Sequence, residues 1–211
     1  MSYQEFKPRQ FQQIPVVVKN ILIINIILFV TKALWEMHAI PQVIDLDRYL
    51  DLYPVGTPYF KPHQFISYMF MHADLAHIFL NMLGLYMFGS ILENLWGAKR
   101  FLNFYLACGL GAAALQLGIS AINDQYTILL GASGAVFGLL VAFAMMFPNT
   151  ELQVYFIIPV KAKYLVSAYA LFELYNGFFS HDNVAHFAHL GGLAVGVIIM
   201  LIWKRNKTFF F

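Results

Sequence analysis

Long blocks of mostly apolar residues, separated by short polar segments, run through almost the whole chain. A membrane-spanning helix needs about 20 consecutive residues of this kind. Only 11% of the residues are charged, whereas soluble domains carry about 25%, so a soluble core could not bury this much apolar surface. The sequence therefore predicts an all-α membrane protein, embedded in a lipid bilayer by six spans at residues 15–35, 75–95, 101–122, 133–147, 163–179 and 184–203.

The segments around these spans define the expected domain organisation. The first block is longer than the apolar region of a signal peptide, so we expect it to remain as a membrane helix. Residues 36–74 are too polar to span, and we place them outside as a partly embedded loop. No repeat or linker divides the chain. We expect a cytoplasmic segment at 1–14, one membrane domain at 15–203 and a cytoplasmic tail at 204–211.

Positive charge sets the expected orientation, because cytoplasmic flanks retain lysine and arginine during insertion. The formal net charge of +2 is too small to indicate a nucleic-acid partner. Most cations lie before span one, between spans two and three, before span five and after span six: Lys7, Arg9, Lys19, Lys99, Arg100, Lys161, Lys163, Lys204, Arg205 and Lys207. Both termini should therefore be cytoplasmic, and spans two, four and six should run inward from the outer face.

Four polar residues lie early in those three inward-running spans. His77 and Asn81 are four residues apart on span two, so their side chains share one helical face. Ser133 opens span four, and His189 lies near the start of span six. All four residues should share one shallow layer near the outer leaflet. Buried polar groups in a membrane are costly, which favours a common function.

Small residues surround the serine and the histidine of this layer. Glycines occur at Gly131, Gly134, Gly138, Gly192 and Gly196. Glycines spaced by four allow membrane helices to approach closely, so spans four and six should touch and bring Ser133 to His189. A serine hydroxyl is a weak nucleophile until a base accepts its proton, and neutral imidazole is the usual base near pH 7.

Three motifs, in order on spans two, four and six, resemble the signatures of the rhomboid family of intramembrane serine proteases. They are His72-x4-His77-x3-Asn81, Gly131-x-Ser133-Gly134 and Ala188-His189-x2-Gly192-x3-Gly196. The resemblance covers roughly residues 60–203. It implies a six-helix bundle that cleaves single-span membrane proteins near the outer membrane face, without a cofactor.

The resemblance also implies a role for each residue of the site. Ser133 would attack a peptide carbonyl, and His189 would act as general base and then as general acid. The Ser133 N–H, His77 and Asn81 would form an oxyanion hole. No acidic third member is evident in the sequence, so a Ser/His dyad is expected. Packing would orient the imidazole, and Phe137, one turn after Ser133, is the candidate for that contact.

Each of these residues also has a plainer interpretation. His77 and Asn81 could make a helix–helix hydrogen bond, and His72 could support either the loop or the site. His186 and His189 could hold a metal, but no third protein ligand is apparent in the sequence, so no metal is expected. Glu173, within span five, is a functional candidate by its position. We favour a structural hydrogen bond for it near the outer end.

Two other functions compete with proteolysis. A small transporter could line a pathway with buried histidine, asparagine and glutamate, although inverted-repeat symmetry is missing. A catalytically inactive rhomboid-like protein could bind membrane clients without cutting them, but the chain retains both Ser133 and His189. We expect the inner membrane of a bacterium as the location, with an organelle membrane as the alternative. The sequence carries no indication of oligomeric state.

Overall fold

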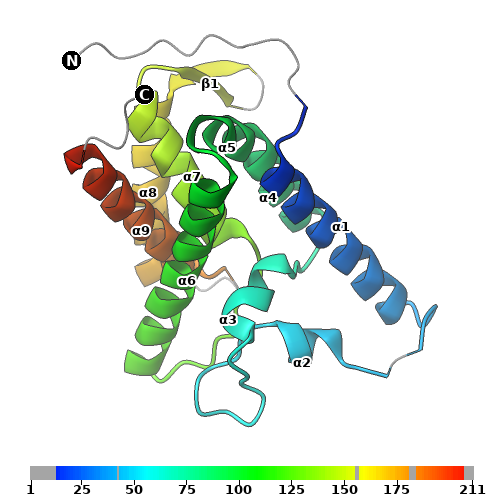
Figure 1. Ribbon diagram of the computed structural model, residues 1–211. Coiled ribbons are helices and arrows are strands. Elements are labelled where there is room, and N and C mark those ends of the chain that lie inside the picture. Colours follow the sequence, from blue (N-terminus) through cyan, green and yellow to red (C-terminus); the bar gives the residue numbers. More distant parts are fainter. Residues whose placement is uncertain (1–12, 42, 155–156, 181–183, 207–211) are drawn as a thin grey trace.

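The computed structural model describes residues 13–41, 43–154, 157–180 and 184–206. The terminal cations Lys7, Arg9 and Lys207 lie outside these ranges, as do most of the two predicted cytoplasmic segments. The described chain is mostly helical (Figure 1). Its long helices are α1 (Val16–Glu36), α4 (Leu75–Gly84), α6 (Ala98–Ile122), α7 (Ser133–Met146), α8 (Ala162–Phe179) and α9 (His186–Arg205).

Each predicted span falls on a helix, with its ends shifted by up to three residues. Helix α4 continues through a π-helical turn, η2 (Leu85–Gly89), into α5 (Ser90–Trp96). Among the described residues, four helical segments are long and apolar enough to cross a membrane: Val16–Glu36, Leu75–Trp96, Ala98–Ile122 and His186–Arg205. Helix α7 is apolar but has only 14 residues. Helix α8 has 18 residues and is not among the four.

The prediction of an all-α fold is wrong in one segment. Strands β1 (Glu151–Val154) and β2 (Ile158–Lys161) form an antiparallel hairpin, with Glu151 opposite Lys161. The hairpin lies between α7 and α8, shortly after Pro148 and Asn149. Proline disfavours helix for the residue before it, and the alternation of apolar and polar residues that follows suits a strand.

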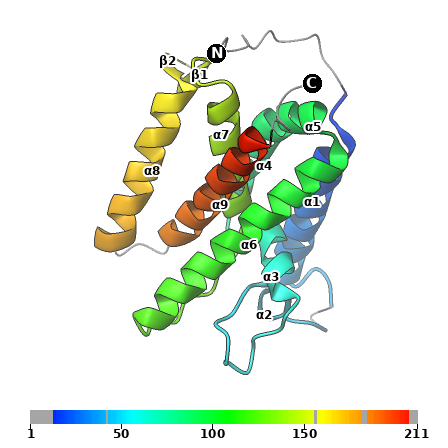
Figure 2. The ribbon, with the colours of Figure 1, turned by 60° about the vertical axis from the view of Figure 1, so that its left-hand side comes forward.

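The remaining short elements lie in the segment between the first two spans. They are α2 (Leu46–Leu50), α3 (Gln64–Ser67) and the 3₁₀ turn η1 (Tyr68–Phe70). This segment is anchored at several points: Lys32 of α1 pairs with Asp47 at 2.8 Å, and Leu52 pairs through its backbone with Leu129. In Figures 1 and 2, α2 and α3 lie at the opposite end of the molecule from the hairpin, the start of α1 and the end of α9.

Helices α6, α7 and α9 pack most extensively against one another, and α9 lies between α6 and α8 (Figure 2). The predicted glycine contact between spans four and six is confirmed. A Cβ atom on Gly192 would overlap the carbonyl group of Gly134, and one on Gly196 would lie 3.2 Å from the Gly138 oxygen. These backbones therefore touch directly, which brings the first turns of α7 and α9 together.

Helix α1 joins this core through a buried carboxylate. Glu93 of α5 accepts hydrogen bonds from the backbone N–H groups of Val17 at 2.9 Å and Val18 at 2.8 Å. The first N–H groups of a helix have no partner within the helix, so the carboxylate satisfies two of them and complements the positive end of the helix dipole.

Candidate active site

Ser133 and His189 lie in hydrogen-bonding contact. His189 Nε2 is 2.8 Å from Ser133 Oγ, and the pair is partly buried. Ser133 is the first residue of α7, and His189 lies in the first turn of α9. When Nε2 carries no proton, the serine hydroxyl donates to it. This arrangement can transfer the hydroxyl proton to the imidazole, which is the first requirement for a serine nucleophile.

The loop before α7 depends on a glycine. Gly131 has φ +115°, a conformation that side chains other than glycine rarely adopt. A Cβ atom there would lie 2.6 Å from His77 Nε2 and 3.8 Å from Ser133 Oγ. The imidazole of His77 and the hydroxyl of Ser133 therefore border the same space beside Gly131.

The start of α9 is held by a polar residue from α6. The side-chain oxygen of Gln116 accepts a hydrogen bond from the backbone N–H of Ala188 at 3.2 Å, and its amide donates to Ser120 Oγ at 3.2 Å. Ala188 immediately precedes His189. The contact thus fixes the backbone that carries the imidazole, although no pattern in the sequence indicated a role for Gln116.

The ring of Phe137 stacks on His189. Their centroids are 4.5 Å apart and their planes differ by 8°. Phe137 lies one turn after Ser133, so the same helix carries the hydroxyl and the ring that restrains the imidazole. Tyr169 of α8 packs edge-on against the ring of Phe137, and the centroids of these two rings are 6.1 Å apart.

An acidic residue lies beside the second ring nitrogen of His189, the one that does not face Ser133. Glu173 Oε2 lies 2.9 Å from His189 Nδ1 and 2.7 Å from His186 Nδ1. The expectation that no acidic third member or third metal-ligand candidate accompanies the histidines is therefore wrong. The three ligand atoms lie within 4.8 Å of one another. Helix α8 supplies the carboxylate, and the sequence offered only two hints: an acid inside a span, and two histidines on one helical face.

The proposed oxyanion residues occupy the first two turns of α4. Asp74 Oδ1 caps the helix by accepting from the backbone N–H of His77 at 2.8 Å. Asn81 is buried, and its amide donates to the carbonyl of His77 at 3.0 Å. An amide carries two N–H donors, so one further donor can serve a ligand. The Nε2 atom of His77 thus lies next to Gly131 in the loop before Ser133. Asn81, in contrast, already uses one of its two N–H donors within α4.

His72 is in contact with His77. Its ring is buried and meets the ring of His77 edge-on, with centroids 4.9 Å apart. Burial lowers the pKa of His72 to about 4, so this histidine is neutral near pH 7. Because its ring contacts His77, His72 is placed to support the orientation of that imidazole.

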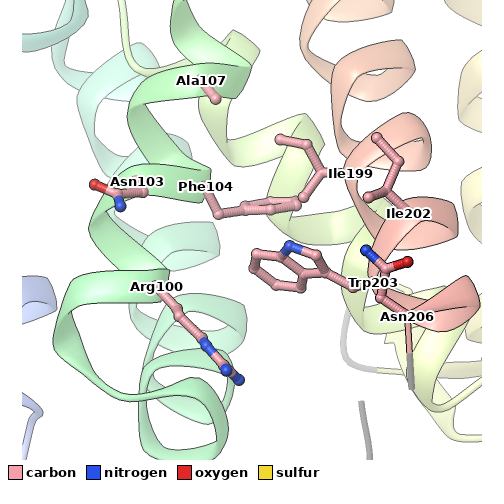
Figure 3. Close-up of a pocket in the computed structure, with 8 residues that line it drawn as sticks. All are labelled: Arg100, Asn103, Phe104, Ala107, Ile199, Ile202, Trp203 and Asn206. Carbon is pink, nitrogen blue, oxygen red and sulfur yellow. The ribbon is translucent and has the colours of Figure 1, made fainter. Parts of the chain in front are cut away.

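A separate pocket of about 560 Å³ lies between α6 and α9 (Figure 3). Figure 3 shows the rings of Phe104 and Trp203 next to each other, with Arg100 below them. Its α9 residues begin at Ile199, ten positions beyond His189. At 1.5 Å per residue that is about 15 Å along the helix, so the pocket is distinct from the Ser133 site.

Comparison with known proteins identifies a domain and several relatives. The rhomboid domain matches residues 59–206. "RHOMBOID-like protein 12, mitochondrial" of Arabidopsis thaliana is 31% identical over 69% of this chain and 46% of its own length. "Presenilin-associated rhomboid-like protein, mitochondrial" of Homo sapiens is 25% identical over 90% of this chain and 50% of its own. "Putative rhomboid protease YdcA" of Bacillus subtilis is 25% identical over 88% of this chain and 90% of its own. The chain thus spans about half the length of the two mitochondrial relatives.

Proposed function

The chain belongs to the rhomboid family, and from that premise we propose that it is an intramembrane serine endopeptidase. Ser133 is the proposed nucleophile and His189 the proposed base. The observation that carries the proposal is the 2.8 Å contact between His189 Nε2 and Ser133 Oγ. A binding protein without activity would have no need for a serine hydroxyl aligned with an imidazole nitrogen.

The proposed reaction uses this contact. Ser133 Oγ attacks the carbonyl carbon of a peptide bond while its proton moves to His189 Nε2. The resulting imidazolium donates the proton to the leaving amine as the carbon–nitrogen bond breaks. Water, deprotonated by the same imidazole, then releases the acyl group from Ser133 and restores both residues.

The negative charge on the attacked carbonyl oxygen needs donors. We assign this role to the Ser133 backbone N–H with the side chains of His77 and Asn81. The N–H lies in the first turn of α7, where helical N–H groups lack partners and the helix dipole favours an anion. His77 Nε2 supports the assignment by its position next to Gly131. Gly134 supports it indirectly, because a side chain there would overlap Ala112 of α6 and displace the first turn of α7.

The protein is a multi-pass integral membrane protein. In the proposed topology, six helices cross the bilayer, both termini are cytoplasmic, and residues 15–203 form the membrane domain between segments 1–14 and 204–211. The 14 residues of α7 extend about 21 Å, less than the roughly 30 Å hydrocarbon core, so Ser133 can lie below the outer surface. Reporter fusions at both termini test this topology, and an external carboxyl terminus would contradict it.

The proposed substrates are single-span membrane proteins, cut near the outer face. The membrane assigned is the inner membrane of a bacterium, although several relatives are named as mitochondrial. Membrane fractionation of the native cell tests that assignment.

The decisive experiment uses purified protein in liposomes with a single-span substrate. We expect Ser133→Ala and His189→Ala each to abolish cleavage while the variants stay folded, because nucleophile and base act as one unit. A fluorophosphonate should label the wild type and leave Ser133→Ala unlabelled. Cleavage near the wild-type rate by either variant would refute the Ser/His mechanism.

A further inference from the structure

One carboxylate oxygen joins the two histidines at the start of α9. Glu173 Oε2 lies within hydrogen-bonding distance of Nδ1 of both His186 and His189. Glu173 and His186 are buried at 5% and 6% exposure. A buried carboxylate in a membrane is costly unless polar partners surround it, and the two imidazoles supply those partners.

This contact determines which nitrogen of each histidine carries the proton. An ionised carboxylate attracts protonated nitrogens: His186 Nδ1 donates a hydrogen bond to Glu173 Oε2, and the same oxygen, 2.9 Å from His189 Nδ1, favours a proton on that nitrogen. A neutral imidazole has one N–H, so Nε2 of His189 is left with a free lone pair. That lone pair is the acceptor that the hydroxyl of Ser133 reaches at 2.8 Å.

A metal ion is the competing explanation for two histidines and a glutamate in one cluster. Atoms that share one tetrahedral zinc at about 2.0–2.1 Å lie about 3.4 Å apart. The observed separations of 2.7 Å and 2.9 Å are both shorter than this, and the 2.7 Å contact of His186 is a hydrogen bond. A metal on His189 Nδ1 would also displace the proton that defines the reactive tautomer.

We propose that Glu173 is a positioning residue for the Ser133–His189 pair. It holds His189 in the tautomer that accepts the serine proton, and it stabilises the imidazolium that forms during attack. His186 holds the same carboxylate oxygen in place through its own hydrogen bond. Phe137 restrains the plane of the ring, whereas Glu173 restrains its rotation within that plane and its protonation. The inference rests on the proposed proteolytic function and adds a third group to the expected dyad.

The test compares two changes at Glu173 that separate size from charge. Glu173→Gln keeps the volume but removes the negative charge that would stabilise the imidazolium, and its NH₂ group, when it faces a histidine, favours the wrong tautomer of that ring. Glu173→Asp keeps the charge on a shorter side chain. Disrupting the equivalent contact in a serine protease lowers kcat by about 10⁴-fold. We expect Glu173→Gln to lose at least roughly 100-fold in kcat with little change in KM, and Glu173→Asp to retain more activity than Glu173→Gln.

Glu93→Gln is the matched control, since Glu93 is also buried but bonds the start of α1. It should lower thermal stability while kcat of the folded protein stays unchanged. Nitrogen-15 NMR spectra of histidine-labelled protein report which ring nitrogen carries the proton, and a purely structural role of Glu173 would leave this tautomer unchanged. They should show His189 protonated on Nδ1 in the wild type, with this population reduced in Glu173→Gln.

Several results would overturn the inference. Wild-type kcat in Glu173→Gln would remove Glu173 from the mechanism, and a Gln variant more active than the Asp variant would assign it to packing. Loss of wild-type turnover on treatment with a chelator, restored by zinc, would replace the hydrogen-bonded cluster with a metal site. Ser133→Ala and His189→Ala are measured in parallel. If they retain activity, the proposed function itself fails; if they are inactive while Glu173→Gln is not, only this inference fails.

Discussion

Substituting Gly192 by alanine should separate the nucleophile from its base. A methyl group there would lie 3.0 Å from Gly134 Cα and overlap the carbonyl of the same residue. Both obstacles are backbone, so no side-chain rotation relieves them. Restoring an ordinary contact of about 3.5 Å requires the helices to move apart by on the order of 1 Å. The 2.8 Å contact between Ser133 Oγ and His189 Nε2 would then exceed hydrogen-bonding distance.

The expected cost follows from that displacement. Overpacking a core costs about 1–3 kcal/mol of stability. A misplacement of about 1 Å in reacting groups can cost about 100-fold in rate. We therefore expect Gly192→Ala to lose most of its activity and to unfold at a lower temperature than the wild type. Cleavage in liposomes and thermal unfolding in detergent measure the two effects separately.

Two other glycines calibrate this prediction. On Gly196, a Cβ atom would meet Val141 Cγ1 at 2.8 Å and the Gly138 backbone at 3.2 Å. The valine side chain can rotate, so Gly196→Ala should have an intermediate effect. On Gly118 of α6 a Cβ atom would meet nothing within 4 Å, so Gly118→Ala should be neutral or slightly stabilising. Equal activity of Gly192→Ala and Gly118→Ala would refute the reasoning.

Two further predictions concern the donors of the site and the external loop. Asn81→Ala and His77→Ala should each lower turnover with little change in substrate affinity. Because the donors are redundant, each loss should be smaller than the roughly 100-fold to 1000-fold that is typical of a sole oxyanion donor. Unchanged steady-state cleavage in both variants and in the double variant would show that these residues serve helix packing only. Burial and then the charge of Asp47 raise the pKa of Asp51 to about 7. The unfolded chain releases this proton near pH 4 and the folded protein near pH 7, so the free energy of unfolding should fall as pH rises across that window. The difference between the two pKa values corresponds to at most about 4 kcal/mol. Asp51→Asn should therefore unfold at a higher temperature than the wild type at pH 8 and at a similar temperature at pH 4, and a difference independent of pH would contradict this.

The sequence determined the features that depend on local pattern. Apolar blocks of near-spanning length set the positions of the long helices, because a backbone in lipid must satisfy its own hydrogen bonds. The spacing of His77 and Asn81 put both residues on one helical face. Glycines beside Ser133 and His189 predicted that α7 and α9 touch, since only residues without a side chain allow backbones that close.

The tertiary structure alone decided which groups surround the imidazole. Helical periodicity fixes the residues that share a face, but it does not fix how a helix is rotated or which neighbour that face meets. Glu173 reaches His189 only because α8 packs beside α9 with its carboxylate turned inward. The hydrogen bond from Asn81 to the His77 carbonyl and the support of α9 by Gln116 likewise depend on contacts that no local pattern encodes. The hydroxyl and the imidazole could thus be read from the sequence, whereas the carboxylate beside them required the packing of a third helix.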